Sequence, residues 1–314
     1  MRDLISERGG RLITRGNLDG IACAAVFSER YPELAVRFVT SPPAAVREVL
    51  GGDAPALVAD IPLTDDMVMV LDARGGAVRL VDHHPTSLRS EHAHIDMGRS
   101  AAGALHAFLG DRAAGARIAA VADVHERSES ALVRSMGAEH GRDRLEREAE
   151  VLDLAWRLNV EDDAFRLDAA RALAEGRWPS EVPAIVQRCE AVRRGGHWDK
   201  AVDAVNDRLE VRGGVGLLDL RGKRVSLHGF GAAALAEAAR ARRCGYTLLL
   251  RGSGSTATAS VRAAGSGALD LGRFVEEFTH VHGIGGGGHR ASAGARVPSG
   301  AADLLIDRLV AAAC

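Results

Sequence analysis

The sequence has few aromatic residues, few cysteines and no long apolar run. Phe, Trp and Tyr make up only 4% of its 314 residues, so we do not expect nucleic-acid binding that depends on many bases stacked on aromatic side chains. The cysteines show no paired spacing typical of a metal site, which predicts free thiols in a reducing cytosol. They are Cys23, Cys189, Cys244 and Cys314.

No apolar run approaches the length that crosses a membrane, and residues 1–8 lack the apolar segment of a signal peptide. We therefore expect a cytoplasmic protein with no membrane partner. Charge is nearly balanced, with 40 Lys and Arg against 42 Asp and Glu and a pI near 6.6. This balance argues against a protein that coats long nucleic acid, but it allows a small anionic ligand in a local site.

The order of predicted elements indicates an α/β protein of two domains. Residues 1–190 open with a strand, a polar turn and an apolar helix, which predicts a parallel sheet. Gly195 and Gly196 mark a plausible linker, and residues 197–314 predict a second, smaller α/β domain. The predicted strands cover residues 11–14, 36–39, 56–60, 77–81, 215–220, 246–250 and 256–262, and the main helices residues 21–27, 100–109, 232–242 and 269–278.

Polar side chains gather where the strands of the first domain end. Asp82, His83 and His84 follow the strand at 77–81, and an Asp with two His residues can bind a divalent metal, shuttle a proton or hold a phosphate. Alone, the triplet is equally consistent with a surface turn. Other strand ends deliver Asp60, and Asn17 with Asp19, and ligands bind beyond the carboxyl ends of open α/β sheets. We therefore expect one shared polar site.

Two further features are ambiguous by themselves. Asp123 ends the apolar run at 117–125 and is either another ligand or a surface acid at a helix end. The glycines Gly285, Gly286, Gly287 and Gly288 predict a loop whose N–H groups cradle an anion, although a merely flexible loop has the same pattern. His289 directly after it, and Arg262 at the end of a predicted strand, favour the phosphate-binding interpretation.

Together these motifs resemble the DHH/DHHA1 phosphoesterase superfamily. Asp82-His83-His84 matches the motif that names it, Ala59-Asp60 looks like the second motif, and Asp123 is the candidate for the fourth. The segments Ser260–Arg262 and Gly285–Gly294 are similar to the DHHA1 signature. The likeness spans nearly the entire chain, and it is greatest to the branch of oligoribonucleases, phosphoadenosine-phosphate phosphatases and exopolyphosphatase-related proteins.

The resemblance implies hydrolysis of phosphoester or phosphoanhydride bonds with two Mn²⁺ ions, Mg²⁺ being the alternative, in a cleft between the domains. Asp60 would bridge the ions, and Asp19, His83 and Asp123 would complete one site. His84 would face the scissile phosphate, and Asp82 would orient a histidine. Arg262, His289 and the glycine loop Gly285–Gly288 would hold another part of the substrate. The implied substrates are short oligonucleotides, nucleotide bisphosphates or short polyphosphate.

The first motif departs from the family pattern. Relatives carry His-x-Asp-x-Asp-Gly or Asp-x-Asp-x-Asp-Gly, whereas this chain has Arg15-Gly16-Asn17-Leu18-Asp19-Gly20. Arg15 cannot coordinate a metal, and Asn17 offers only a weak, neutral oxygen ligand. Three interpretations stay open: Arg15 clamps phosphate in place of one ion, the substrate recruits the second ion, or the chain is a non-catalytic nucleotide- or phosphate-binding protein. A homodimer through Ala-rich helices such as residues 232–242 is also open.

Overall fold

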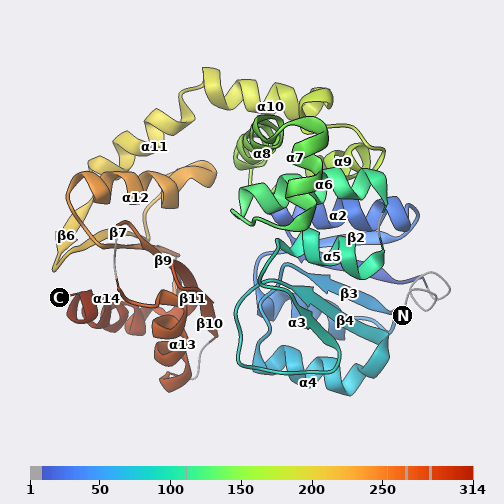
Figure 1. Cartoon of the computed structure of the whole chain (residues 1–314). Coiled ribbons are helices and arrows are strands. Elements are labelled where there is room, and N and C mark those ends of the chain that lie inside the picture. Colours follow the sequence, from blue (N-terminus) through green and yellow to red (C-terminus); the bar gives the residue numbers. More distant parts are fainter. Residues whose placement is uncertain (1–8, 111, 253, 266–267, 283–284, 314) are drawn as a thin grey trace. The chain divides into compact units, whose positions relative to one another are not determined.

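The computed structural model describes residues 9–110, 112–252, 254–265, 268–282 and 285–313 (Figure 1). The chain forms two compact units, Met1–Ala191 and Val192–Cys314. The N-terminal segment of residues 1–8 and Cys314 lie outside the described residues, and the other cysteines are free and buried. None of the described helices combines the length and the apolar character that crossing a bilayer requires.

The first unit contains the expected parallel sheet, which confirms the α/β fold class. Its strands are β1 (Arg11–Arg15), β2 (Ala35–Val39), β3 (Ala56–Ala59), β4 (Val78–Asp82) and β5 (Ala93–Ile95). They are ordered β2-β1-β3-β4-β5, and every neighbouring pair is parallel. The order reverses direction at β1, so the switch point of this sheet lies between β1 and β3.

Helices cover both faces of this sheet (Figure 1). They are α2 (Leu18–Arg30), α3 (Pro42–Leu50), α4 (Asp65–Arg74), α5 (Ala101–Leu109), α6 (Ala113–His125) and α9 (Asp163–Ala174), with the short turn η1 (Gly75–Ala77) before β4. Alternate strand residues serve two cores: Leu12 and Leu57 pack with α2, α5, α6 and α9, and Ile13 and Val58 pack with α3 and α4.

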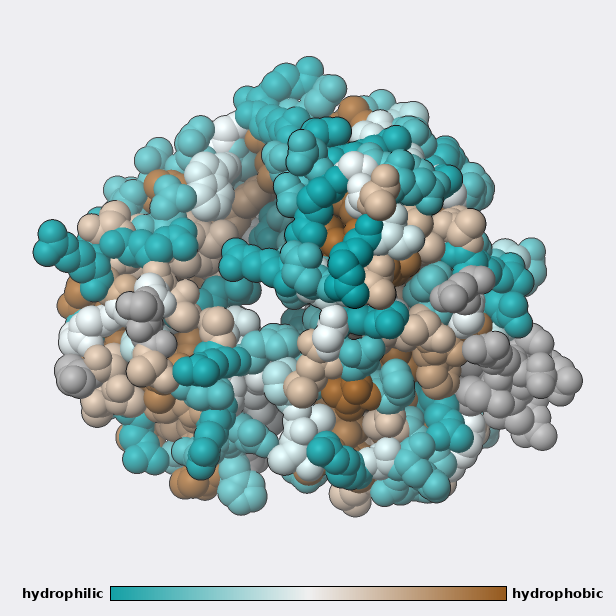
Figure 2. All heavy atoms as spheres, in the orientation of Figure 1, coloured by the Kyte–Doolittle hydropathy of each residue, from teal (hydrophilic) through white to brown (hydrophobic). Residues whose placement is uncertain are grey.

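The remaining helices of this region follow α6. They are α7 (Ala131–His140), α8 (Arg142–Arg157), the short turn η2 (Pro179–Glu181) and α10 (Pro183–Arg194). In α8, which is amphipathic, Leu145, Ala149 and Leu152 are buried, whereas most charged residues of the helix are exposed. Figure 2 shows hydrophilic residues over α7, α8 and α10, toward the top of the view.

The second unit has a mixed six-stranded sheet. Its strands are β6 (Glu210–Arg212), β7 (Val215–Arg221), β8 (Tyr246–Gly252), β9 (Thr256–Ala263), β10 (Gly286–His289) and β11 (Ser292–Pro298). They are ordered β10-β11-β9-β8-β7-β6, with β7–β8 parallel and the other pairs antiparallel. The helices are α11 (His197–Asn206), η3 (His228–Phe230), α12 (Gly231–Ala241), α13 (Leu271–Val281) and α14 (Ser299–Ala313).

The prediction of a loop at the glycine run is wrong for Gly286, Gly287 and Gly288, which form the edge strand β10 with His289. Two of these glycines, Gly286 and Gly288, have other atoms very close to the position of a Cβ. A Cβ on Gly288 would lie 2.4 Å from the carbonyl oxygen of Ser292, and a Cβ on Gly272 of α13 would lie 2.4 Å from the carbonyl oxygen of Gly288. Close packing of strand and helix therefore accounts for Gly286 and Gly288, whereas no described atom lies within 4 Å of a Cβ on Gly287.

Candidate metal centre at the carboxyl edge of the first sheet

Two neighbouring strands deliver a compact group of ligand-type side chains. Asp60 follows β3, and Asp82, His83 and His84 stand at the end of β4. One candidate ligand atom from each of the four lies within 4.8 Å of the others, and all four residues are buried. The local sequence explains this placement, because parallel strands bring their carboxyl ends to the same edge of a sheet.

Asp60 is held in an unfavourable state. Its φ of 54° lies in the left-handed region, which is uncommon for residues other than glycine and marks local strain. Its side chain is buried, and the Oδ2 atom has no hydrogen-bond partner among the described residues. Burial raises the pKa of Asp60, while the charge of Arg15 is the strongest influence in the opposite direction. An orphaned, buried carboxylate oxygen of this kind is suited to receive a cation.

His83 presents one ring nitrogen to Asp60. Its Nδ1 lies 3.2 Å from the carbonyl oxygen of Arg99, which can only accept, so Nδ1 carries a proton. Its Nε2 lies 3.8 Å from Oδ1 of Asp60. Burial lowers the pKa of His83, but Asp19 and Asp60 outweigh it and raise that pKa to about 9. The surroundings of His83 thus favour a positive charge at this point.

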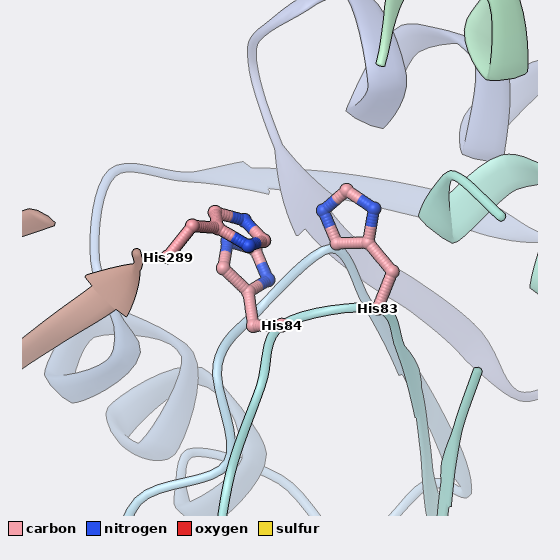
Figure 3. A group of neighbouring side chains, drawn as sticks. All are labelled: His83, His84 and His289. Atoms are coloured by element: carbon pink, nitrogen blue, oxygen red, sulfur yellow. The ribbon is translucent and has the colours of Figure 1, made fainter. Parts of the chain in front are cut away.

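Asp82 and His84 form a hydrogen-bonded pair (Figure 3 shows the ring of His84 beside that of His83). Nδ1 of His84 donates to Oδ1 of Asp82 at 2.8 Å, and the backbone N–H of His84 donates to Oδ2 at 3.1 Å. Burial alone would raise the pKa of Asp82, but the charge and hydrogen bond of His84 lower it overall. An ionised Asp82 fixes the ring orientation of His84 and makes Nε2 the nitrogen that can contact a ligand or exchange a proton.

Asp19 lies beside this group but is engaged elsewhere. Its two carboxylate oxygens accept hydrogen bonds from the backbone N–H groups of Ala101 and Ala102, at 2.8 and 2.9 Å, at the start of α5. Its Oδ2 is also 3.8 Å from Nδ1 of His83. Burial and the neighbouring Asp60 raise the pKa of Asp19 well above its usual range. Asp19 therefore acts on His83 as a nearby charge, and its role as a metal ligand stays a prediction.

The structure does not bring Asp123 into the four-residue group. Its Oδ1 accepts from the N–H and the hydroxyl of Ser100, both at 2.7 Å, and its Oδ2 accepts from the hydroxyl of Ser130 at 2.6 Å. Ser100 and Ser130 are also the N-caps of α5 and α7. A metal ligand role for Asp123 stays a prediction.

The first motif forms the turn between β1 and α2. Asn17 is the N-cap of α2, and its Oδ1 accepts from the N–H of Gly20 at 2.9 Å. A Cβ on Gly20 would lie 1.8 Å from the carbonyl oxygen of Arg15, so the turn is tightly closed. Asn17 thus has a structural role that explains its residue type without a metal.

In the second unit, Arg262 and His289 belong to one row of residues. Ser292 of β11 pairs with Arg262 of β9 on one side and with His289 of β10 on the other. Directly paired residues project from the same face of a sheet, so the three share a face. The position of Arg262 within its strand agrees with the sequence prediction; its contact with substrate stays a prediction.

The proteins found to be similar to this chain are solved structures. No family model matches the chain, and no curated protein sequence matches it. A pGpG-specific phosphodiesterase from Vibrio cholerae matches with a TM-score of 0.53 at 16% identity, over 96% of this chain and 97% of that one. The DHH domain of a protein assigned to a family of ribosomal proteins matches with a TM-score of 0.63 at 15% identity, over 98% and 86%.

RecJ from Thermus thermophilus, solved with Mn²⁺, matches with a TM-score of 0.61 at 15% identity, over 99% of this chain and 53% of RecJ. These matches extend over nearly the full length of this chain and share one architecture. This chain has the DHH/DHHA1 fold. The resemblance in the motifs and the resemblance in the fold therefore agree.

Within this DHH/DHHA1 fold, the residues present fit one divalent cation. Asp60 offers an oxygen with no hydrogen-bond partner among the described residues. His83 offers Nε2, because the hydrogen bond from Nδ1 to the carbonyl of Arg99 fixes the tautomer of the ring. Such oxygen and imidazole ligands suit Mn²⁺ or Mg²⁺. A second ion on the side of the first motif fits poorly. There Arg15 is a cation itself, and the oxygen of Asn17 already accepts a hydrogen bond.

Sequence reasoning missed the residues that support this site. The carbonyl of Arg99, the hydroxyls of Ser100 and Ser130, and the start of α5 orient His83, Asp123 and Asp19. Ser100 was recognisable only as a helix start. No local signal distinguishes a carbonyl or serine that contacts a site from one that does not, because the contact depends on tertiary packing.

Proposed function

We propose that the protein is a metal-dependent phosphoesterase that acts on small phosphorylated substrates. The observation that carries the proposal is the orphaned Oδ2 of buried Asp60, in a carboxylate that lies opposite Nε2 of His83. A cation bound there, with Mn²⁺ as the first candidate and Mg²⁺ as the alternative, would withdraw charge from a phosphoryl oxygen. Asp60 and His83 would hold the cation.

The Asp82–His84 pair has the geometry of a proton-transfer unit. Asp82 anchors Nδ1 of His84, so Nε2 can donate a hydrogen bond to the substrate or exchange a proton with it. Arg15 adds a positive charge next to Asp60. We assign the hydrolytic machinery to these residues, and substrate contacts outside it to Arg262 and His289.

Short oligonucleotides, nucleotide bisphosphates and short polyphosphate are the substrates to test first. The near-zero net charge favours short ligands over long nucleic acid. The Vibrio cholerae phosphodiesterase of similar fold is specific for pGpG, which makes a dinucleotide a good starting probe.

The test is release of phosphate or mononucleotide from this panel by the purified protein with excess Mn²⁺. We expect activity that falls by at least about 100-fold in Asp60→Ala and His83→Ala. His106→Gln is the matched control, because His106 is a buried histidine that contacts Arg112 instead of this group. Turnover of none of these substrates would refute the hydrolase assignment.

The second candidate is a non-catalytic nucleotide- or phosphate-binding protein. The observation that favours it is the first motif, where Arg15 cannot coordinate a metal and Asn17 is the N-cap of α2. This candidate predicts saturable ligand binding that needs Arg262 and His289 but is indifferent to Mn²⁺. Metal content after dialysis separates the two, because one Mn²⁺ per chain supports the hydrolase and none supports the binder.

A further inference from the structure

A buried arginine lies under the β1–α2 turn. Arg166 of α9 is only 7% exposed. Its guanidinium donates to the carboxylate of Asp163 and to the carbonyl oxygen of Val160, and its Nε has no hydrogen-bond partner among the described residues. Asp163 is 57% exposed in its side chain, so solvent screens this ion pair and it compensates little of the buried charge.

The guanidinium of Arg166 lies directly against Gly16. A Cβ on Gly16 would be 2.3 Å from Cζ of Arg166, closer than any side chain can approach. Gly16 does not have a positive φ, so a side chain at this position would be limited by the space that Arg166 takes and would displace its guanidinium. The guanidinium also lies 5.5 Å from the ring centre of Phe38, near the end of β2. Arg166 therefore supports the turn from the side of α2 and α9.

Arg15 flanks the same turn from the opposite face of the sheet. Side chains alternate along β1, with Leu12 in the core beside α2 and Ile13 in the core beside α3 and α4. Arg15 therefore shares the face of Ile13, whereas Gly16 lies on the side of Arg166. Two guanidinium groups thus lie next to the turn. Arg15 directly precedes it in the chain, and Arg166 of α9 packs against it.

The N-terminal end of α2 adds a third positive contribution. This helix of 13 residues begins at Leu18, and the first N–H groups of a helix carry partial positive charge. Cations at this end of a helix are unfavourable unless an anion lies between them. The acid of the first turn of α2, Asp19, is bonded to the start of α5, so the turn beside Gly16 suits an anion with several oxygens, such as a phosphate group.

We propose that Arg15 and the β1–α2 turn form a phosphate subsite, with Arg166 as the positioning residue that holds Gly16 and supplies buried positive charge. The proposal rests on the proposed function only in taking a phosphorylated ligand. The subsite lies at the first motif, where the family that this chain resembles carries metal-binding acids. Here the guanidinium of Arg15 would neutralise the negative charge of the phosphate in place of a metal ion.

The test is titration of the metal-free full-length protein with inorganic phosphate, followed by calorimetry or phosphorus NMR. We expect Arg166→Met to weaken phosphate binding by about tenfold, because it removes a buried positive charge next to the turn and the support of Gly16. Arg166→Lys should restore part of the affinity, because it keeps the charge without the planar fork. A purely structural role would not produce this charge-dependent rescue.

Arg188→Met is the matched control. Arg188 is another largely buried arginine near α9 that bonds to Asp162 and to the carbonyl of Ala155. We expect it to lower the melting temperature without changing phosphate affinity. Equal phosphate binding by the wild type and Arg166→Met would overturn the proposal, and so would an equal loss of affinity in Arg188→Met.

A double-mutant cycle covers the case in which Arg166→Met folds poorly. Gly16→Ala should weaken phosphate binding in the wild type, because the added Cβ displaces the guanidinium, and should have little further effect when Arg166 is already Met. Strictly additive effects would contradict the proposed coupling. Mn²⁺-dependent hydrolysis is measured separately, so its absence would refute the enzyme assignment and leave the phosphate titration to decide the subsite.

Discussion

Nδ1 of His84 lies 2.8 Å from Oδ1 of Asp82, and both residues are buried at the end of β4. The carboxylate fixes one ring nitrogen and directs the other away from itself. This arrangement gives His84 a defined tautomer, which a surface turn with the same three residues would not provide.

Replacing Asp82 by Asn tests that relationship. The amide keeps the shape but removes the charge that holds the His84 tautomer, so we expect hydrolysis to fall by about 10- to 100-fold. The change should appear mainly in kcat rather than in KM. Steady-state kinetics with the substrate found in the panel will measure it, and an unchanged kcat would remove His84 from the proton-transfer role.

Asp60→Asn should stabilise the metal-free protein. Asn tolerates the positive φ of this position, and the substitution removes a buried charge whose Oδ2 is unpartnered among the described residues. We expect a gain of about 1 kcal/mol and loss of the Mn²⁺-induced rise in melting temperature. Asp123→Asn is the contrasting control, because Asp123 accepts three hydrogen bonds. We expect this substitution to lower the free energy of unfolding by about 1–3 kcal/mol.

The stability of the metal-free protein should fall as pH rises. The folded-state pKa of His83 is raised from 6.5 to about 9, so its contribution is complete below pH 6.5 and is lost as pH passes through about 9. The raised pKa values of Asp19 and Asp60 act in the same direction. Thermal unfolding across this range with EDTA, and again with Mn²⁺, measures the effect.

Mn²⁺ should suppress that loss, because the cation replaces the proton on His83 and its binding strengthens as pH rises. His83→Gln should flatten the pH dependence of the metal-free protein. A melting temperature that instead increased steadily with pH in EDTA would contradict the charge distribution described for this site.

Arg15→His combined with Asn17→Asp should create a second metal site. The substitutions replace a cation and a neutral amide by two residues that coordinate Mn²⁺. We expect bound Mn²⁺ to increase from one to two ions per chain after dialysis, as measured by elemental analysis. Two ions already present in the wild type would show that Arg15 does not exclude the second one.

The sequence by itself determined the α/β class, the strand ends that carry Asp60 and the Asp-His-His triplet, and the approximate positions of α2, α5, α12 and α13. These features are local: alternation of apolar residues sets strands and helices, and parallel strands must present their carboxyl ends together. The departure in the first motif was also visible, because residue type alone shows that Arg15 cannot coordinate a metal.

Only the tertiary structure decided which of these residues act together. Asp123 was either a ligand or a surface acid by its sequence; the structure buries it and bonds it to Ser100 and Ser130, and a ligand role stays a prediction. The glycine run looked like a loop, but β11 and α13 make it a strand. The contact of Arg166 with Gly16 joins segments far apart in the chain. Such contacts depend on side-chain packing between separate elements, and no local pattern encodes it.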